Sequence, residues 1–92
     1  MEILDIIHRN PGIIHSTIDD EIVLFSADTN SYFNLNRTGS IIWELIENPI
    51  SVQELINQLA TRFQIDPSEI TDDVIDYISP LESKGIIKKN IS

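Results

Sequence analysis

The sequence contains no cysteine and only two histidines, His8 and His15, among its 92 residues. The absence of cysteine excludes disulfides and thiolate metal sites. Neither histidine stands in a patterned acidic cluster, which disfavours a zinc site and a Ser-His-Asp triad. The three glycines do not form the glycine-rich loop that cradles phosphate groups. We therefore expect no metal, no cofactor and no catalytic residues, and a protein that is not an enzyme.

Basic residues and long apolar runs are also scarce. Fifteen acidic residues against six basic ones give a formal net charge of −9. Such a charge repels the phosphate backbone of nucleic acids and favours basic or neutral partners. The apolar runs extend over only a few residues, too short to cross a bilayer, and the N-terminus does not have the pattern of a signal peptide. We expect a soluble, cytoplasmic protein with neither a nucleic-acid nor a membrane partner.

Ninety-two residues with this apolar content suit one small domain with a single core. The first part of the chain alternates short apolar segments with clusters of turn residues, a pattern typical of strands joined by tight connections. The predicted strands cover residues 13–17, 21–26 and 31–35. Their short connections favour an antiparallel meander.

Three helices are predicted after the strands. The first runs from about residue 37 to 47 and ends before Asn48-Pro49. Ser51 and Asp66 start the second and third helices as N-caps, each followed three residues later by a glutamate that completes a capping box. Gly85 suits the left-handed end of the third helix, and residues 86–88 then form a short extended tail. The expected fold is α+β, a three-stranded antiparallel sheet followed by three helices in a winged-helix-like arrangement.

The helices carry apolar residues at helical spacing, and Trp43 is expected in the core. The predicted buried faces are Val52, Leu55, Ile56, Leu59 and Phe63 in the second helix and Ile70, Val74, Tyr77, Ile78 and Leu81 in the third. Pro80 lies inside the third helix and removes a hydrogen bond to the carbonyl of Asp76. The resulting bend is either tolerated near the helix end or shapes a groove beside the helix.

The strand at residues 31–35 is aromatic and runs straight into a helix capped by Asn36. Side chains alternate along a strand, so Phe33 and Leu35 share one face and Tyr32 and Asn34 the other. Phe33 and Leu35 are the better core pair. If this strand lies at a sheet edge, its backbone offers a site for an incoming peptide strand. The alternative is a strand with ordinary half-exposed side chains.

The third helix tests whether a winged-helix-like fold would bind DNA here. Between residues 66 and 83 it carries six acidic residues and no lysine or arginine, the opposite of what a phosphate-facing surface needs. DNA binding is therefore disfavoured. Asp72, Asp73 and Asp76 exceed what capping requires, and they either form a solvated face or receive Lys or Arg from a bound chain.

An ordered set of motifs from residue 11 to 88 resembles the PqqD-like family, the precursor-peptide recognition elements of pathways that modify ribosomally made peptides. The matching residues are Tyr32-Phe33-Asn34-Leu35-Asn36, Gly39, Ile42-Trp43-Glu44-Leu45, Ser51-Val52, Glu54-Leu55, Arg62-Phe63, Asp66-Pro67, Glu69, Asp73-Val74, Tyr77-Ile78, Leu81 and Gly85-Ile86-Ile87. The resemblance implies a non-catalytic adaptor or peptide chaperone. It also implies that the leader segment of a precursor binds as an added strand beside the third strand, in a groove completed by the third helix.

Carried over to this chain, the resemblance implies a peptide-binding site formed by Ser31, Tyr32, Phe33, Asn34, Leu35, Asp73, Asp76, Tyr77 and Pro80. A discrete chain of this length resembles the stand-alone members, including those of lasso-peptide pathways, which deliver the precursor to a separate leader protease and cyclase. Other members serve radical maturases, and the sequence does not distinguish these partners.

Residues 1–10 have no clear counterpart in the family, so we treat them as an N-terminal extension to a domain at 11–92. Their aliphatic side chains suit an added strand, a cover for the sheet or a contact with a partner enzyme, and packing is favoured. Two rival functions remain: an acidic winged-helix regulator acting through protein contacts, and a hydrolase or ligase subunit whose catalysis is completed in a complex. The missing nucleophile–base pairs disfavour the second.

Overall fold

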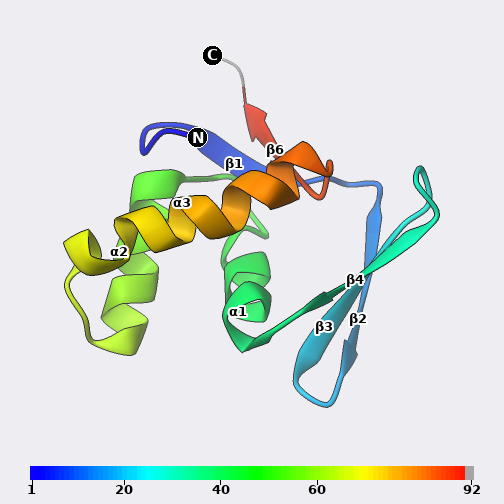
Figure 1. Ribbon diagram of the computed structural model, residues 1–92, viewed down its shortest axis with the longest axis horizontal. Coiled ribbons are helices and arrows are strands. Elements are labelled where there is room, and N and C mark those ends of the chain that lie inside the picture. The colour runs from blue at the N-terminus through cyan, green and yellow to red at the C-terminus, as the bar shows by residue number, and fades with distance from the viewer. Residues whose placement is uncertain (91–92) are drawn as a thin grey trace.

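Two three-stranded antiparallel sheets and three helices make up the computed structural model, which describes residues 1–90 (Figure 1). The α+β class predicted from the sequence is confirmed. The elements are β1 (Ile6–Arg9), β2 (Ile13–Ile18), β3 (Glu21–Ser26), β4 (Ser31–Leu35), α1 (Arg37–Leu45), β5 (Ile50–Ser51), α2 (Val52–Phe63), α3 (Pro67–Ser83) and β6 (Ile87–Asn90). The bounds of β3 and β4 are those predicted, whereas α1 ends before the predicted residue 47.

The predicted meander is the sheet with strand order β2-β3-β4. Ile18 pairs with Glu21 across a two-residue turn. Asp19 and Asp20 have φ angles of 49° and 68°, the left-handed conformation of the hairpin turn that matches strand twist. Figure 1 shows this sheet standing out from the helical part, with α1 between it and α2. The order leaves β2 and β4 as the two edges.

The second sheet, with strand order β5-β1-β6, was not anticipated from the sequence. Ile6 pairs with Ser51 of β5 and with Asn90 of β6, so β1 is the central strand. Residues 1–10, treated above as an extension, therefore contribute a strand, and Ile7 within it is fully buried at 0% exposure. The predicted extended tail becomes β6.

The three helix starts are capped by the residues predicted. Asn36 Oδ1 accepts a hydrogen bond from the Gly39 amide at 2.8 Å, and Ser51 Oγ accepts one from the Glu54 amide at 3.0 Å. Asp66 accepts from the amide of Ser68 at 2.9 Å, one residue earlier than a capping box requires. The hydrogen bonds that the Ser68 amide and the Ser68 hydroxyl donate to Asp66 Oδ1 lower the pKa of the Asp66 carboxyl group below its usual value. α3 ends at Ser83 with Lys84 as its C-cap, and Gly85 follows in the predicted left-handed conformation, with a φ of +77°.

Residues from both sheets and all three helices form one core, which includes Trp43 at 2% exposure. The predicted inner face of α2 is buried except at its end, where Phe63 is 42% exposed. The prediction for Phe63 was wrong because α2 ends there and the chain turns back through the left-handed Gln64. In α3 only Val74 and Ile78 are buried, at 6% and 0% exposure, and the helix continues through Pro80 to Ser83. No helix within residues 1–90 is long and apolar enough to cross a membrane.

Candidate functional site

The open edge of β4 is the centre of the candidate site. The Ile22 amide donates to Ser40 Oγ at 3.2 Å, and Ser40 Oγ donates to the Leu35 carbonyl at 3.4 Å. A hydroxyl therefore bridges this residue pair, and the backbone groups of Ile22 and Leu35 face each other. Backbone direction alternates along an antiparallel ladder. It follows that Tyr32 and Asn34 direct their N–H and C=O groups outward, to the edge that β3 does not cover.

The side chains of β4 divide between the two faces as the alternation predicts. Tyr32 is 72% exposed and Asn34 is exposed, whereas Phe33 is half-buried and Leu35 is buried at 3%. The Tyr32 ring lies against Phe25 of β3, with centroids 4.8 Å apart. The inner face of β4 thus turns toward the helices, and its outer face and edge stay open.

Tyr77 of α3 joins that helix to the end of β4. Its hydroxyl donates to Asn36 Oδ1 at 3.4 Å, the same oxygen that caps α1. The ring reaches this position because position 39 is glycine, and a Cβ there would collide with the Tyr77 hydroxyl. Burial raises the pKa of the Tyr77 hydroxyl above its usual value, so the group is a proton donor at neutral pH.

A cavity of about 270 Å³ opens where the end of β4 meets the helices. Its lining is mostly apolar, with a polar rim, and consists of Asn36, Thr38, Ile42, Leu59, Phe63, Ile70, Asp73, Val74 and Tyr77. Pockets for whole small molecules usually measure about 300–1,000 Å³. This cavity is slightly smaller, which suits one apolar side chain of a longer ligand. The exposed position of Phe63 places its ring among the lining residues.

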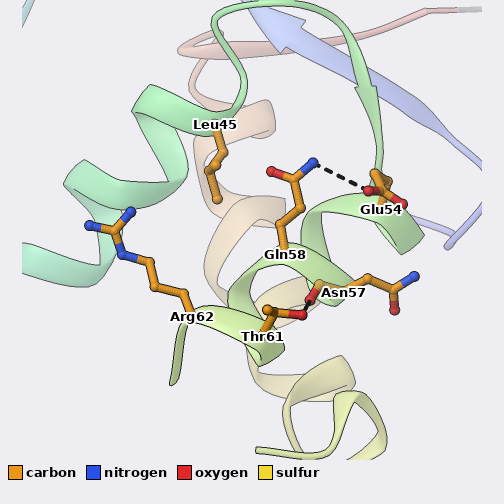
Figure 2. Close-up of a pocket in the computed structure, with 6 residues that line it drawn as sticks. All are labelled: Leu45, Glu54, Asn57, Gln58, Thr61 and Arg62. Carbon is orange, nitrogen blue, oxygen red and sulfur yellow. Dashed lines mark hydrogen bonds between the residues drawn. The ribbon is translucent and has the colours of Figure 1, made fainter. Parts of the chain in front are cut away.

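Three other hollows in the described part of the chain contain none of the predicted site residues. Figure 2 shows one of about 370 Å³ between α1 and α2, reaching from Leu45 to Arg62. Two of its polar side chains are hydrogen-bonded along α2 itself: Gln58 Nε2 donates to Glu54 at 3.3 Å, and the Thr61 hydroxyl donates to the Asn57 carbonyl at 3.0 Å. It contains no nucleophile beside a base. Among the described residues, no three acidic or histidine side chains are grouped as metal ligands.

The structure gathers part of the predicted site and leaves part of it apart. Asp73 and Tyr77 line the cavity at the end of β4. Asp76 and Pro80 are exposed on α3 and do not line it. Lys84, whose Nζ lies 5.5 Å from the centroid of the Phe33 ring, was not predicted as a site residue from the sequence. The same is true of several residues that share one lining: Asn36, Ile42, Phe63, Ile70 and Val74. The helical periodicity identified most of these as apolar, but their convergence depends on helix packing.

A family model described as coenzyme PQQ synthesis protein D (PqqD) matches residues 21–87. The chain belongs to the PqqD family. The resemblance inferred from the strand-to-helix motifs is thereby confirmed. Among solved structures, this PqqD-family chain is similar to TbiB1 in complex with the TbiA(beta) leader peptide. The TM-score is 0.81 at 26% sequence identity, and the match covers 92% of this chain and 99% of the other. A search of curated proteins found no match.

Proposed function

We propose that this chain is a non-catalytic adaptor that binds the leader segment of a ribosomally made precursor peptide and delivers it to processing enzymes. The observation that carries the proposal is the open edge of β4, where the backbone groups of Tyr32 and Asn34 point outward beside α3. The family membership and the match to a structure with a bound leader peptide support the same function. The leader adds a strand to β4, and backbone pairing sets its geometry.

The apolar cavity supplies most of the discrimination in this proposal. A leader strand on β4 alternates its side chains, so every second one faces the helices. An apolar side chain near Asn36 enters the space between Ile42 and Val74. Burial of apolar surface contributes about 25 cal/mol per Å², whereas the exposed acidic residues of α3 chiefly raise the association rate of a basic leader. In this proposal α3 contributes to the peptide-binding groove the four residues predicted from the sequence, Asp73, Asp76, Tyr77 and Pro80.

The adaptor itself carries out no chemistry in this account. Tyr77 lines the cavity, and the pKa of its hydroxyl is raised by burial. The hydroxyl therefore stays protonated at neutral pH and is unsuited to act as a base. Processing falls to a separate enzyme, either a leader protease or a modifying enzyme. We place this step in the cytoplasm, where ribosomal precursors are made. The acidic regulator finds no support in the family or the structural match.

A proline substitution at the edge tests the proposal. Asn34→Pro removes an outward N–H that the leader needs, whereas Asn34→Ala keeps it. Thr17→Pro is the matched control, since the register across the Ile18–Glu21 turn directs the Thr17 amide outward at the opposite edge, β2. Calorimetric titration with a synthetic precursor leader peptide that binds the parent chain should show binding lost only in Asn34→Pro. Equal binding by all three variants would contradict strand addition at β4.

A further inference from the structure

We propose that the groove between β4 and α3 selects the direction of the bound peptide by charge, with Lys84 as the residue that receives a peptide carboxylate. The proposal rests on the proposed function and adds the charge pattern of the ligand. The two ends of the groove differ in charge: one end is basic and the other is acidic.

Lys84 marks the basic end. It is the C-cap of α3, and its side chain extends over the inner face of β4, with Nζ 5.5 Å from the centroid of the Phe33 ring. Within residues 1–90, the one salt bridge joins Lys89 to Asp5 at 3.8 Å, so Lys84 has no carboxylate partner. A helix C-terminus favours a cation, but that preference does not direct the side chain onto Phe33. The contact places a positive charge where the inward side chains of an added strand would lie.

Asp73 marks the acidic end. It lines the cavity together with Asn36 and Tyr77, and Asp76 follows it on the exposed side of α3. Neither carboxylate takes part in the salt bridge that the described residues form. Since the cavity itself is apolar, a ligand that fills it brings its neighbouring residues within reach of Asp73.

The order of these contacts along the chain shows in which direction α3 runs relative to β4. Phe33 of β4 faces Lys84 at the end of α3, and Asn36, three residues later, bonds to the earlier Tyr77. β4 and α3 therefore pass each other in opposite directions. A peptide added antiparallel to β4 runs with α3, from the acidic end to the basic end. Its complementary charge pattern is Lys or Arg first and Asp or Glu later. Asp73 and Lys84 are eleven positions apart, and at ~1.5 Å per helical residue this separation equals about five residues of a strand at ~3.3 Å per residue. The acidic residue therefore follows about four or six residues after the basic one, where the two side chains face the same way. A peptide added parallel to β4 would need the reverse order.

The test is a selection from a displayed library of random peptides, which requires no knowledge of the natural leader. Peptides are selected on the parent chain and counter-selected on Asn34→Pro, so that the survivors depend on the β4 edge. The same selection is run on Lys84→Glu and on Lys88→Glu, which makes the same charge change at an exposed position of β6. Thermal melts check that each variant is folded.

We expect the peptides selected on the parent chain to carry Lys or Arg before Asp or Glu. Peptides selected on Lys84→Glu should carry Lys or Arg in place of that acidic residue. Peptides selected on Lys88→Glu should have the same pattern as those selected on the parent. In one selected peptide, Glu→Gln at the acid should weaken binding to the parent and to Lys84→Arg about two- to fivefold, as an exposed ion pair implies. Binding to Lys84→Gln should not change. The charge selection would be overturned, with strand addition intact, if the peptides that depend on β4 carry no acidic residue at this position. The same would follow if that residue does not change from acidic to basic on Lys84→Glu. A selection with no survivors dependent on β4 would overturn both.

Discussion

Gly39 carries no side chain at the point where Tyr77 crosses from α3 to the first turn of α1. The close approach lets one oxygen, Oδ1 of Asn36, cap α1 and accept from Tyr77. Three elements thus meet at one carboxamide. Asn36 and Tyr77 both line the cavity, so their contact forms part of its wall. The shape of the candidate site therefore depends on a missing Cβ.

Replacing Gly39 with alanine should destabilise the protein even though alanine is the better helix former. The propensity gain is about 1 kcal/mol, whereas overpacking costs about 1–3 kcal/mol, so we expect a net loss of up to about 2 kcal/mol in urea unfolding. Tyr77→Phe, which removes the colliding hydroxyl, should recover part of the loss in the double variant. Gly12→Ala is the control, because its Cβ would meet only Asn10 Oδ1 at 3.4 Å. Parent-like stability of Gly39→Ala would contradict the packing described.

Tyr77 should also make stability fall at alkaline pH. Burial raises the pKa of its hydroxyl in the folded state, while in the unfolded chain the hydroxyl ionises near pH 10. Above about pH 10 the unfolded state holds fewer protons than the folded state, so stability declines as the pH rises. The full contribution is present below that range. Denaturation of the parent and of Tyr77→Phe between about pH 8 and 11 should show a shallower decline in the variant, and identical slopes would contradict a buried Tyr77.

At the scale of the elements, prediction from sequence succeeded where the signals are local. The turn residues around Asp19 and Asn30, together with the apolar segment at 21–26 and the aromatic one at 31–35, predicted β3 and β4, and Ser51 and Asp66 predicted two helix starts. The pairing of β1 with β5 and β6 joins residues far apart in the chain, and no local pattern specified it. The cavity was missed for the same reason. Its residues come from three helices whose relative angles are set by packing.

α3 provides the second testable element. Asp73 borders the cavity and Asp76 is exposed beside it. Replacing both with asparagine should slow association of a basic leader several-fold at low salt, because exposed charges steer encounter. The deficit should shrink near 0.15 M salt, where the screening length is about 8 Å, and dissociation should change little. Stopped-flow kinetics measure both rates. The Asp19→Asn/Asp20→Asn double variant is the control, because it makes the same charge change in the turn between β2 and β3. Unchanged association in the Asp73→Asn/Asp76→Asn variant would make these acids a solvated surface only.

At the scale of the whole molecule, the N-terminal strand β1 pairs with strands from distant parts of the chain. β1 lies between β5, just before α2, and β6, after α3, so the first and last strands of the chain close one sheet. Figure 1 shows β1 and β6 side by side over the helices, away from the β2–β4 sheet. The edge proposed to bind peptide thus belongs to the other sheet, apart from β1 and β6.

Ile7 tests whether β1 belongs to the same cooperative unit. It is fully buried, whereas Leu4 in the same segment is 81% exposed. Ile7→Ala should lower the free energy of unfolding by about 2–5 kcal/mol, with a single transition, and Leu4→Ala should change it by less than about 0.5 kcal/mol. Thermal and urea unfolding followed by circular dichroism measure both. Equal, small effects would show that β1 docks without stabilising the fold.

Amide hydrogen exchange along β4 tests the central claim, pairing of a leader with the open edge, most directly. In the free chain the amides of Tyr32 and Asn34 face outward, and the Phe33 amide faces β3. Adding the synthetic leader to the ¹⁵N-labelled chain should slow exchange at residues 32 and 34 and leave Phe33 nearly unchanged, with chemical shift changes along residues 31–36 and α3. Unaltered exchange at both outward amides, with shift changes confined to α2, would contradict the account.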